Sequence, residues 1–169
     1  MATVVFARHA LVAFAVLAAG VLSGCNTTQT AAVQSGAAAS NIRISNIEIS
    51  TAPLLAQSGN LIAQWVQQTL PGALAQAFSA NMAPGDPDGA TLSVRVDSIY
   101  LGEGGPADPD AMKGVATLSG PAARQTKLQA TSTYISSPVD QTLVDQAMQG
   151  RVQALSQSFA YWLKRKWRL

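Results

Sequence analysis

The chain has 169 residues, of which 48% are hydrophobic and 12% are charged, and its 11 Lys and Arg nearly balance its 9 Asp and Glu. This balance argues against a nucleic-acid-binding protein, which needs concentrated positive charge to displace counterions from phosphates. The apolar content is enough for one globular domain with a single core.

The first 24 residues have the pattern of an export signal. Arg8 precedes an apolar run from Ala10 to Val21, and small residues follow at Ser23 and Gly24. A positive start, a short apolar middle and a small-residue end are typical of a secretory signal peptide, and the run is too short to span a membrane as a folded helix. We therefore expect residues 1–24 to be absent from the mature protein.

The junction Leu22, Ser23, Gly24 and Cys25 resembles the lipobox of bacterial lipoproteins. In that family the cysteine sulfur receives a diacylglyceryl group, the chain is cut just before the cysteine, and the new amine is usually acylated, for example with palmitate. The resemblance implies that Cys25 is lipidated and that its acyl groups hold the domain on a membrane. An ordinary signal with a chance cysteine and a short membrane anchor are the alternatives.

The mature protein would have no histidine and no free thiol, because His9 lies in the signal and lipidation consumes Cys25, the single cysteine. This excludes Ser-His-Asp and Cys-His nucleophiles, metal sites built on His or Cys, and disulfides. An enzyme would be left with carboxylate chemistry or a Ser-Lys pair, and the acids on or beside predicted strands are Glu48, Asp97 and Glu103. Nothing fixes two of them at the separation that a glycoside hydrolase requires. We expect no enzyme, and no cofactor besides the acyl groups on Cys25.

Residues 25–40 are predicted to be a flexible tether, because positions 26 to 40 are uncharged, mostly small and without periodicity. A flexible coil of about 15 residues has a root-mean-square reach of about 20 Å. Asn26 stands where an Asp would retain a lipoprotein of enteric bacteria in the inner membrane. The predicted location is therefore the periplasmic side of the outer membrane, with the tether carrying a single domain over residues 41–169.

The domain opens with a strand and a long helix. The strand is predicted over residues 41–50, and its isoleucines change parity at Ser45-Asn46, so that a bulge or twist is expected there. Apolar residues at three and four residue spacing predict a helix over residues 53–82. Pro71 falls inside that stripe and removes a backbone donor, so we expect a kink or two consecutive helices at Pro71.

Three strands and a second long helix follow. Strict alternation predicts a strand over residues 92–101, and residues 112–118 and 126–135 are predicted to form a hairpin. The sequence Ser137-Pro138-Val139-Asp140 has the features of a helix start, namely a hydroxyl cap, a proline and an acid in the first turn. The helix is expected to reach the C-terminus, with Gly150 as its weakest point.

The end of the last helix concentrates cations and aromatic rings. The candidate contact residues for an anionic lipid or a protein partner are Lys164, Arg165, Lys166, Arg168, Trp162 and Trp167. Tryptophan is typical of membrane interfaces, and each cation near an anionic surface contributes about 1 kcal/mol. In the alternative interpretation, the cations only offset the helix dipole and keep an exposed helix end soluble.

Four aspartates in two proline-containing turns could form a calcium site if the turns converged, because calcium prefers several oxygen ligands. They are Asp86, Asp88, Asp108 and Asp110. Aspartate is also favoured in turns for its hydrogen bonds to the backbone. We therefore expect solvated turn residues and no metal site.

The order strand, helix, three strands, helix predicts an α+β fold, in which a four-stranded, largely antiparallel sheet carries two helices on one face. By element order and the long cationic last helix, residues 42–169 resemble LptE-like lipoproteins of lipopolysaccharide assembly and auxiliary lipoproteins of envelope ABC transporters. The resemblance implies a non-enzymatic accessory subunit of outer-membrane assembly or of lipid or lipopolysaccharide transport. Its partners would be the membrane through the lipid anchor, an outer-membrane or transporter protein, and lipopolysaccharide or phospholipid, but no nucleic acid. A structural or peptidoglycan-associated lipoprotein is the alternative.

Overall fold

The computed structural model describes residues 42–103, 106–120, 122–133 and 143–169. The predicted signal peptide, the residues Leu22 to Cys25 and the tether therefore lie outside the described residues. The predicted helix start at Ser137 to Asp140 lies outside them as well.

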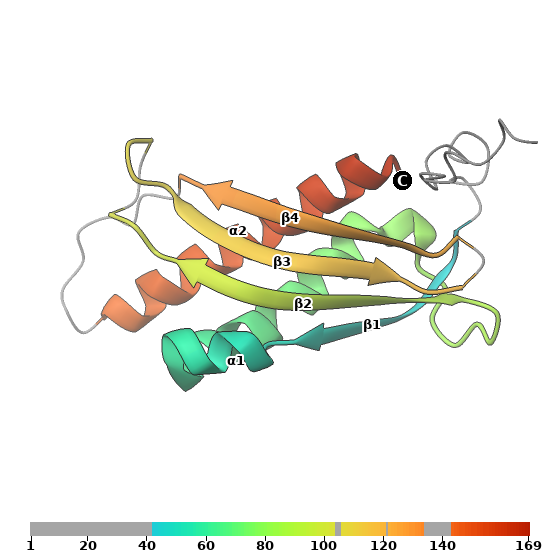
Figure 1. The fold of residues 1–169 in the computed structure, drawn as a ribbon, viewed down its shortest axis with the longest axis horizontal. Helices are drawn as coiled ribbons and strands as arrows, with labels where there is room; N and C mark the ends of the chain where they lie inside the picture. The colour runs from blue at the N-terminus through green and yellow to red at the C-terminus, as the bar shows by residue number, and fades with distance from the viewer. Residues whose placement is uncertain (1–41, 104–105, 121, 134–142) are drawn as a thin grey trace, which may run out of the picture. The chain divides into compact units, whose positions relative to one another are not determined.

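The described chain forms an α+β domain with one mixed sheet. In chain order the elements are β1 (Ile44–Ser50), α1 (Ala52–Ala77), the short 3-10 helix η2 (Ser79–Asn81), β2 (Ala90–Tyr100), β3 (Asp110–Leu118), β4 (Arg124–Ser132) and α2 (Val144–Trp167). The strands lie in the order β1-β2-β3-β4, with β1 parallel to β2 and the other pairs antiparallel. Both long helices cover the same face of the sheet (Figure 1). The predicted fold class is confirmed, and the parallel pair arises because α1 carries the chain back across the sheet between β1 and β2.

The irregularity expected in the first strand is present as a shift of register between Ile44 and Asn46. Ile44 is fully buried, and beyond the shift Ile47 and Ile49 are partly buried against the same core. An extra residue in a strand reverses which face the following side chains take. The bulge thus turns all the isoleucines of this strand towards the helices.

The break in the first helix lies at Gly59 and not at Pro71. Gly59 has φ 78° and ψ 177°, whereas the backbone through Pro71 keeps helical dihedral angles. This combination of dihedral angles is open essentially to glycine alone, because a Cβ would clash with the backbone. The expectation of a kink at Pro71 was therefore wrong, and glycine supplies the break twelve residues earlier.

The second helix packs on β3, β4 and α1, and small residues lie at the centre of these contacts. Gly114 of β3 lies beneath the ring of Phe159, where a Cβ would be 3.4 Å from the ring. The hydroxyls of Thr69 in α1 and Ser156 in α2 are 2.9 Å apart. Ser156 also donates to the carbonyl of Val152 at 2.9 Å, so this buried polar group is satisfied within the helix pair.

Side chains of α2 also occupy the outer edge of the sheet. Ser158 Oγ donates to the carbonyl of Thr131 at 2.7 Å, and Lys166 Nζ donates to the carbonyl of Lys127 at 3.1 Å. Thr131 and Lys127 belong to β4, the last strand of the sheet. Two backbone acceptors of this edge strand are therefore already bonded within the domain.

None of the helices in the described ranges combines the length and the hydropathy needed to cross a membrane.

Candidate functional site

The predicted contact residues lie at the C-terminal end of α2, where two aromatic rings are exposed. Tyr161 and Trp162 are 55% and 44% exposed, and their rings meet edge to face at 5.3 Å. The guanidinium of Arg165 lies 5.4 Å from the centre of the Trp162 ring and donates to the Tyr161 hydroxyl at 3.3 Å. Arg165 thereby holds both rings at the surface through cation–π and hydrogen-bond contacts.

Trp167 is a core residue rather than a contact residue. It is only 6% exposed, and its ring packs against Phe78 at 6.2 Å between centres. The guanidinium of Arg124 of β4 lies over the ring, 5.6 Å from its centre, and donates to the Trp167 carbonyl at 3.2 Å. This placement corrects the expectation that Trp167 is available to a lipid or partner.

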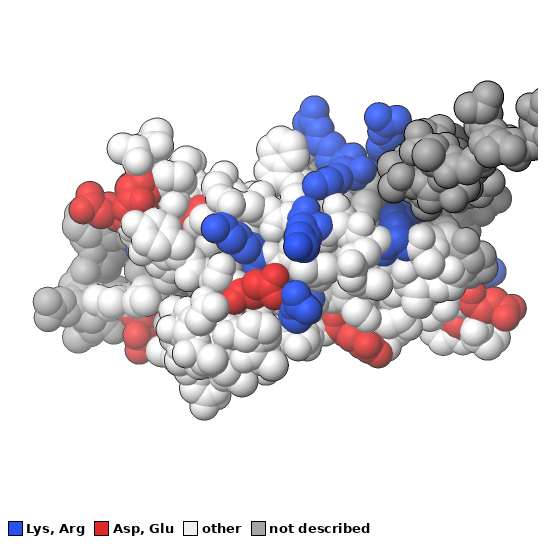
Figure 2. All heavy atoms as spheres, viewed as in Figure 1, with Lys and Arg blue, Asp and Glu red and all other residues white. Residues whose placement is uncertain are grey.

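Cations from β4 extend the cationic helix end, and the sequence reasoning missed them. Together they form a surface that we call the basic edge: Arg124, Lys127, Lys164, Arg165, Lys166 and Arg168. Lys166 joins the two elements, since its Nζ reaches the Lys127 carbonyl. Figure 2 shows Lys and Arg gathered along the side of the domain where Figure 1 draws β4 and the end of α2. The surface thus spans two elements that are about forty residues apart in the chain.

The basic edge exists because charge is segregated along the chain. Residues 42–110 contain two Lys or Arg and seven Asp or Glu, whereas residues 111–169 contain eight and two. The strands lie side by side in chain order, and α2 contacts β3 and β4. A division along the sequence therefore becomes a division across the molecule. The uneven distribution of charge can be counted in the sequence. That it places the cations on one side of the domain follows only from the strand order.

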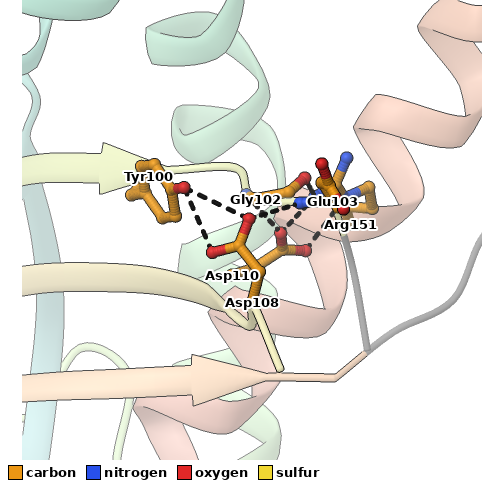
Figure 3. Close-up of polar contacts among 6 residues, drawn as sticks. All are labelled: Tyr100, Gly102, Glu103, Asp108, Asp110 and Arg151. Carbon is orange, nitrogen blue, oxygen red and sulfur yellow. Dashed lines mark hydrogen bonds and ion pairs between the residues drawn. The ribbon is translucent and has the colours of Figure 1, made fainter. Parts of the chain in front are cut away.

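The acidic residues after β2 make a second polar cluster beyond Tyr100, where that strand ends (Figure 3). Asp110, fully buried at the start of β3, pairs with Arg151 of α2, whose Nε donates to Oδ2 at 2.9 Å. Arg151 also donates to the Gly102 carbonyl, and the Gly102 N–H donates to Asp110 Oδ1 at 3.1 Å. The hydrogen bond to Asp110 raises the pKa of Arg151 further above its ordinary value. The cluster joins the β2–β3 connection to the last helix.

Asp108 is more exposed than Asp110. It accepts the Tyr100 hydroxyl at 3.1 and 3.2 Å and the Glu103 N–H at 2.9 Å. The hydrogen bond from the phenol and the charge of Asp108 together raise the pKa of Tyr100, because both favour the protonated hydroxyl.

The four turn aspartates do not converge. Asp86 and Asp88 precede β2, whereas Asp108 and Asp110 follow it, so the length of an eleven-residue strand separates the pairs. Asp86 instead pairs with Arg43 at 3.0 Å and accepts the Asp88 N–H at 3.2 Å. Asp110 is buried in an ion pair, which corrects its expected place in a solvated turn. In the described part of the chain, no group of His, Cys, Asp and Glu could hold a metal ion.

The three acids considered for carboxylate catalysis are also apart. Glu48 accepts from Ser93 Oγ at 3.2 Å and lines an open hollow of about 260 Å³ on the uncovered sheet face. Asp97 pairs with Arg95 at 2.7 Å and lines a different hollow of about 400 Å³. Glu103 lies in the β2–β3 connection. Glu48 and Asp97 thus line two different hollows, and Glu103 lines neither of them.

No family model matches the chain, and no curated protein does. Several solved structures are similar at low sequence identity. A candidate lipoprotein from Caulobacter crescentus is 17% identical, with a TM-score of 0.45 over 72% of this chain and 86% of that one. PelC from Paraburkholderia phytofirmans, a dodecamer in its crystal, is 10% identical, with a TM-score of 0.42 over 78% and 92%. A minor lipoprotein from Acinetobacter baumannii is 10% identical, with a TM-score of 0.33 over 73% and 94%.

Proposed function

We propose that the protein is a lipid-anchored, non-enzymatic accessory subunit of the bacterial envelope that engages an anionic partner through its basic edge. Its role would lie in outer-membrane assembly or in lipid or lipopolysaccharide transport. The observation that carries the proposal is the exposed Tyr161–Trp162 pair, which Arg165 holds at one end of a surface of six cations. Exposed aromatic rings beside cations are the side chains that proteins use at membrane interfaces and against phosphate-bearing groups.

The anchor in this proposal is Cys25, at the end of the lipobox-like residues Leu22 to Gly24. Two or three acyl chains hold a domain on a bilayer without a membrane-spanning helix. Cys25→Ala should therefore leave an unlipidated precursor, because no thioether can form. Metabolic labelling with a fatty acid measures this directly, and label on the Cys25→Ala protein would contradict the anchor.

The contact surface can be tested with two variants of equal charge. The edge variant carries Lys164→Gln, Arg165→Gln and Arg168→Gln, and leaves Lys166 in place because its Nζ bonds to the Lys127 carbonyl. The control variant carries Arg43→Gln, Arg95→Gln and Lys113→Gln, which lie just before β1, on β2 and on β3. Each variant loses three positive charges, so a difference between them reports position rather than net charge.

The experiment is a pull-down of the lipidated protein from gently solubilised envelopes after crosslinking in cells. We expect the wild-type protein and the control variant to recover a stoichiometric membrane protein or lipopolysaccharide, and the edge variant to recover much less. Equal recovery by both variants would place the contact elsewhere. Recovery of peptidoglycan fragments alone would favour the alternative, a structural or peptidoglycan-associated lipoprotein.

A further inference from the structure

The described chain enters the domain at the same end of the sheet as the basic edge. At that end Ile44 of β1 pairs with Ala90, Leu92 of β2 pairs with Leu118, and Leu118 of β3 pairs with Arg124. The starts of β1 and β4 are therefore three strand spacings apart, which is about 15 Å. Arg124 is the first residue of the basic edge. Ile44 and Arg124 therefore lie at the same end of the sheet, on its two opposite edge strands.

The end of α2 closes the same end of the domain. Asn81 Nδ2 donates to the Ile42 carbonyl at 3.1 Å, and its N–H donates to the Phe78 carbonyl at 2.7 Å. Phe78 in turn packs against Trp167, and Arg124 donates to the Trp167 carbonyl. A chain of direct contacts thus connects the point of chain entry to the last turn of the cationic helix.

The chain between Cys25 and the domain is short enough for the distance between chain entry and the basic edge to matter. The predicted tether, as a flexible coil of about 15 residues, would have a root-mean-square reach of about 20 Å, similar to the spacing between chain entry and the basic edge. The other end of β2, with Gly102 and Asp108, lies about 35 Å further along the strand. A tethered surface near its attachment point meets the membrane at a much higher effective concentration than a distant one.

Charge favours the same orientation. The far end carries the acids Glu103, Asp108, Asp110 and Asp145, of which Asp110 is paired with Arg151. At the near end Asp86 is paired with Arg43, and Asp88 lies on the side of β1 and β2, away from β4. An anionic surface would therefore attract the basic edge and repel the far end.

We infer that the basic edge lies flat on the anionic phospholipid surface of the leaflet that holds the Cys25 anchor, so that the domain is docked on this edge rather than suspended from its tether. The inference rests on the proposed lipid anchor and names the partner of the proposed contact surface. Each cation near an anionic surface strengthens binding about fivefold, so loss of three would weaken the docked state by about a hundredfold.

Fluorescence quenching in vesicles tests this orientation with the lipidated, full-length mature protein. Lipidation blocks Cys25, so a single introduced cysteine can be labelled with a fluorophore. One label is placed by Ala123→Cys, exposed directly before Arg124, and its matched partner by Ala107→Cys, exposed at the far end. The proteins are reconstituted into phosphatidylcholine vesicles with or without phosphatidylglycerol, in which a headgroup-labelled lipid quenches the fluorophore.

In vesicles with phosphatidylglycerol, the label at position 123 should be quenched several-fold more than the label at position 107. The difference should disappear without phosphatidylglycerol, in high salt, and in the edge variant, and should persist in the control variant. The measurement in high salt uses the unsubstituted edge, so it tests the docking even if the edge variant folds poorly.

Two failures are distinguishable. Wild-type protein that does not float with the vesicles would overturn the lipid anchor and the docking with it. If the protein floats with the vesicles but both labels are quenched equally, the docking is overturned and the anchor is retained. The same holds if the quenching does not depend on phosphatidylglycerol.

Discussion

Arg151 and Asp110 form an ion pair across 41 residues of chain that joins the second helix to the first position of β3. Asp110 is fully buried and the Arg151 side chain is 14% exposed, so water solvates little of the pair. Gly102 completes the arrangement, since its carbonyl accepts from Arg151 and its N–H donates to Asp110. One pair of opposite charges thus holds the β2–β3 connection and the start of β3 against α2.

Replacing Arg151 with Met should destabilise the domain by about 3 kcal/mol, because it leaves the Asp110 carboxylate buried without its partner. Urea unfolding followed by circular dichroism measures the loss. The double variant Arg151→Met with Asp110→Asn should recover part of it. The exposed pair of Arg95 and Asp97 supplies the control, and Arg95→Met should leave the urea midpoint unchanged. Equal midpoints for Arg151→Met and Arg95→Met would contradict a structural role for the buried pair.

The two tryptophans of the last helix should separate stability from surface contact. Trp167→Ala should cost about 3 kcal/mol, because it removes a buried ring that contacts Phe78 and Arg124. Trp162→Ala should change stability by about 0.5 kcal/mol or less, since the ring is largely at the surface. Thermal unfolding of the two variants gives the comparison, and a larger loss for Trp162→Ala would show that the assignment of core and surface is reversed.

Replacing either of two glycines of α1 with alanine should change the stability of the domain, but in opposite directions. Gly72 has ordinary helical geometry with open space around it, so Gly72→Ala should stabilise the domain by about 0.5–1 kcal/mol. Gly59 also has open space, but its φ of 78° strains any side chain, so Gly59→Ala should destabilise by about 1–2 kcal/mol. Chemical denaturation of both variants tests this. Stabilisation by Gly59→Ala would mean that α1 is continuous in solution.

Tyr100 should ionise at higher pH than an ordinary tyrosine, because its hydroxyl donates to Asp108. A raised pKa in the folded state means that this contact contributes stability fully below the ordinary tyrosine pKa, and that the contribution is lost as pH rises through the folded value. The difference in absorbance near 295 nm between wild type and Tyr100→Phe isolates this titration. In the Asp108→Asn background the same difference should move to lower pH, and an unmoved titration would exclude Asp108 as the cause.

The sequence predicted the order of elements because their periodicities are clear, as in the alternation of Leu92, Val94 and Val96 and the helical stripe of α2. It also predicted the bulge in β1, because isoleucines that change parity within one strand can face the same core only if the strand holds an extra residue. The predicted position of the break in α1 was wrong, because a proline lowers helix stability without always bending the helix. Pro71 keeps helical dihedrals here, whereas Gly59 adopts a conformation that only glycine tolerates.

The candidate site was predicted in part. The cations and Trp162 at the end of α2 could be found as a local cluster, but the burial of Trp167 depends on Phe78, which lies far away in the chain. Arg124 and Lys127 join the surface only because β4 is the strand next to that helix end. The pairing of Asp110 with Arg151 likewise requires the fold, since neither residue has a neighbour in sequence that marks it.

The capped carbonyls of β4 limit how anything can bind at the basic edge. A peptide that adds itself to a sheet needs free backbone acceptors, and those of Lys127 and Thr131 already accept from Lys166 and Ser158. Strand addition by a partner, or by a second copy of this chain, would first have to displace these two side chains. Recognition that avoids this displacement would use cationic and aromatic side chains, whose attraction to anionic groups weakens with salt, and growth of the sheet on this side is opposed at both positions.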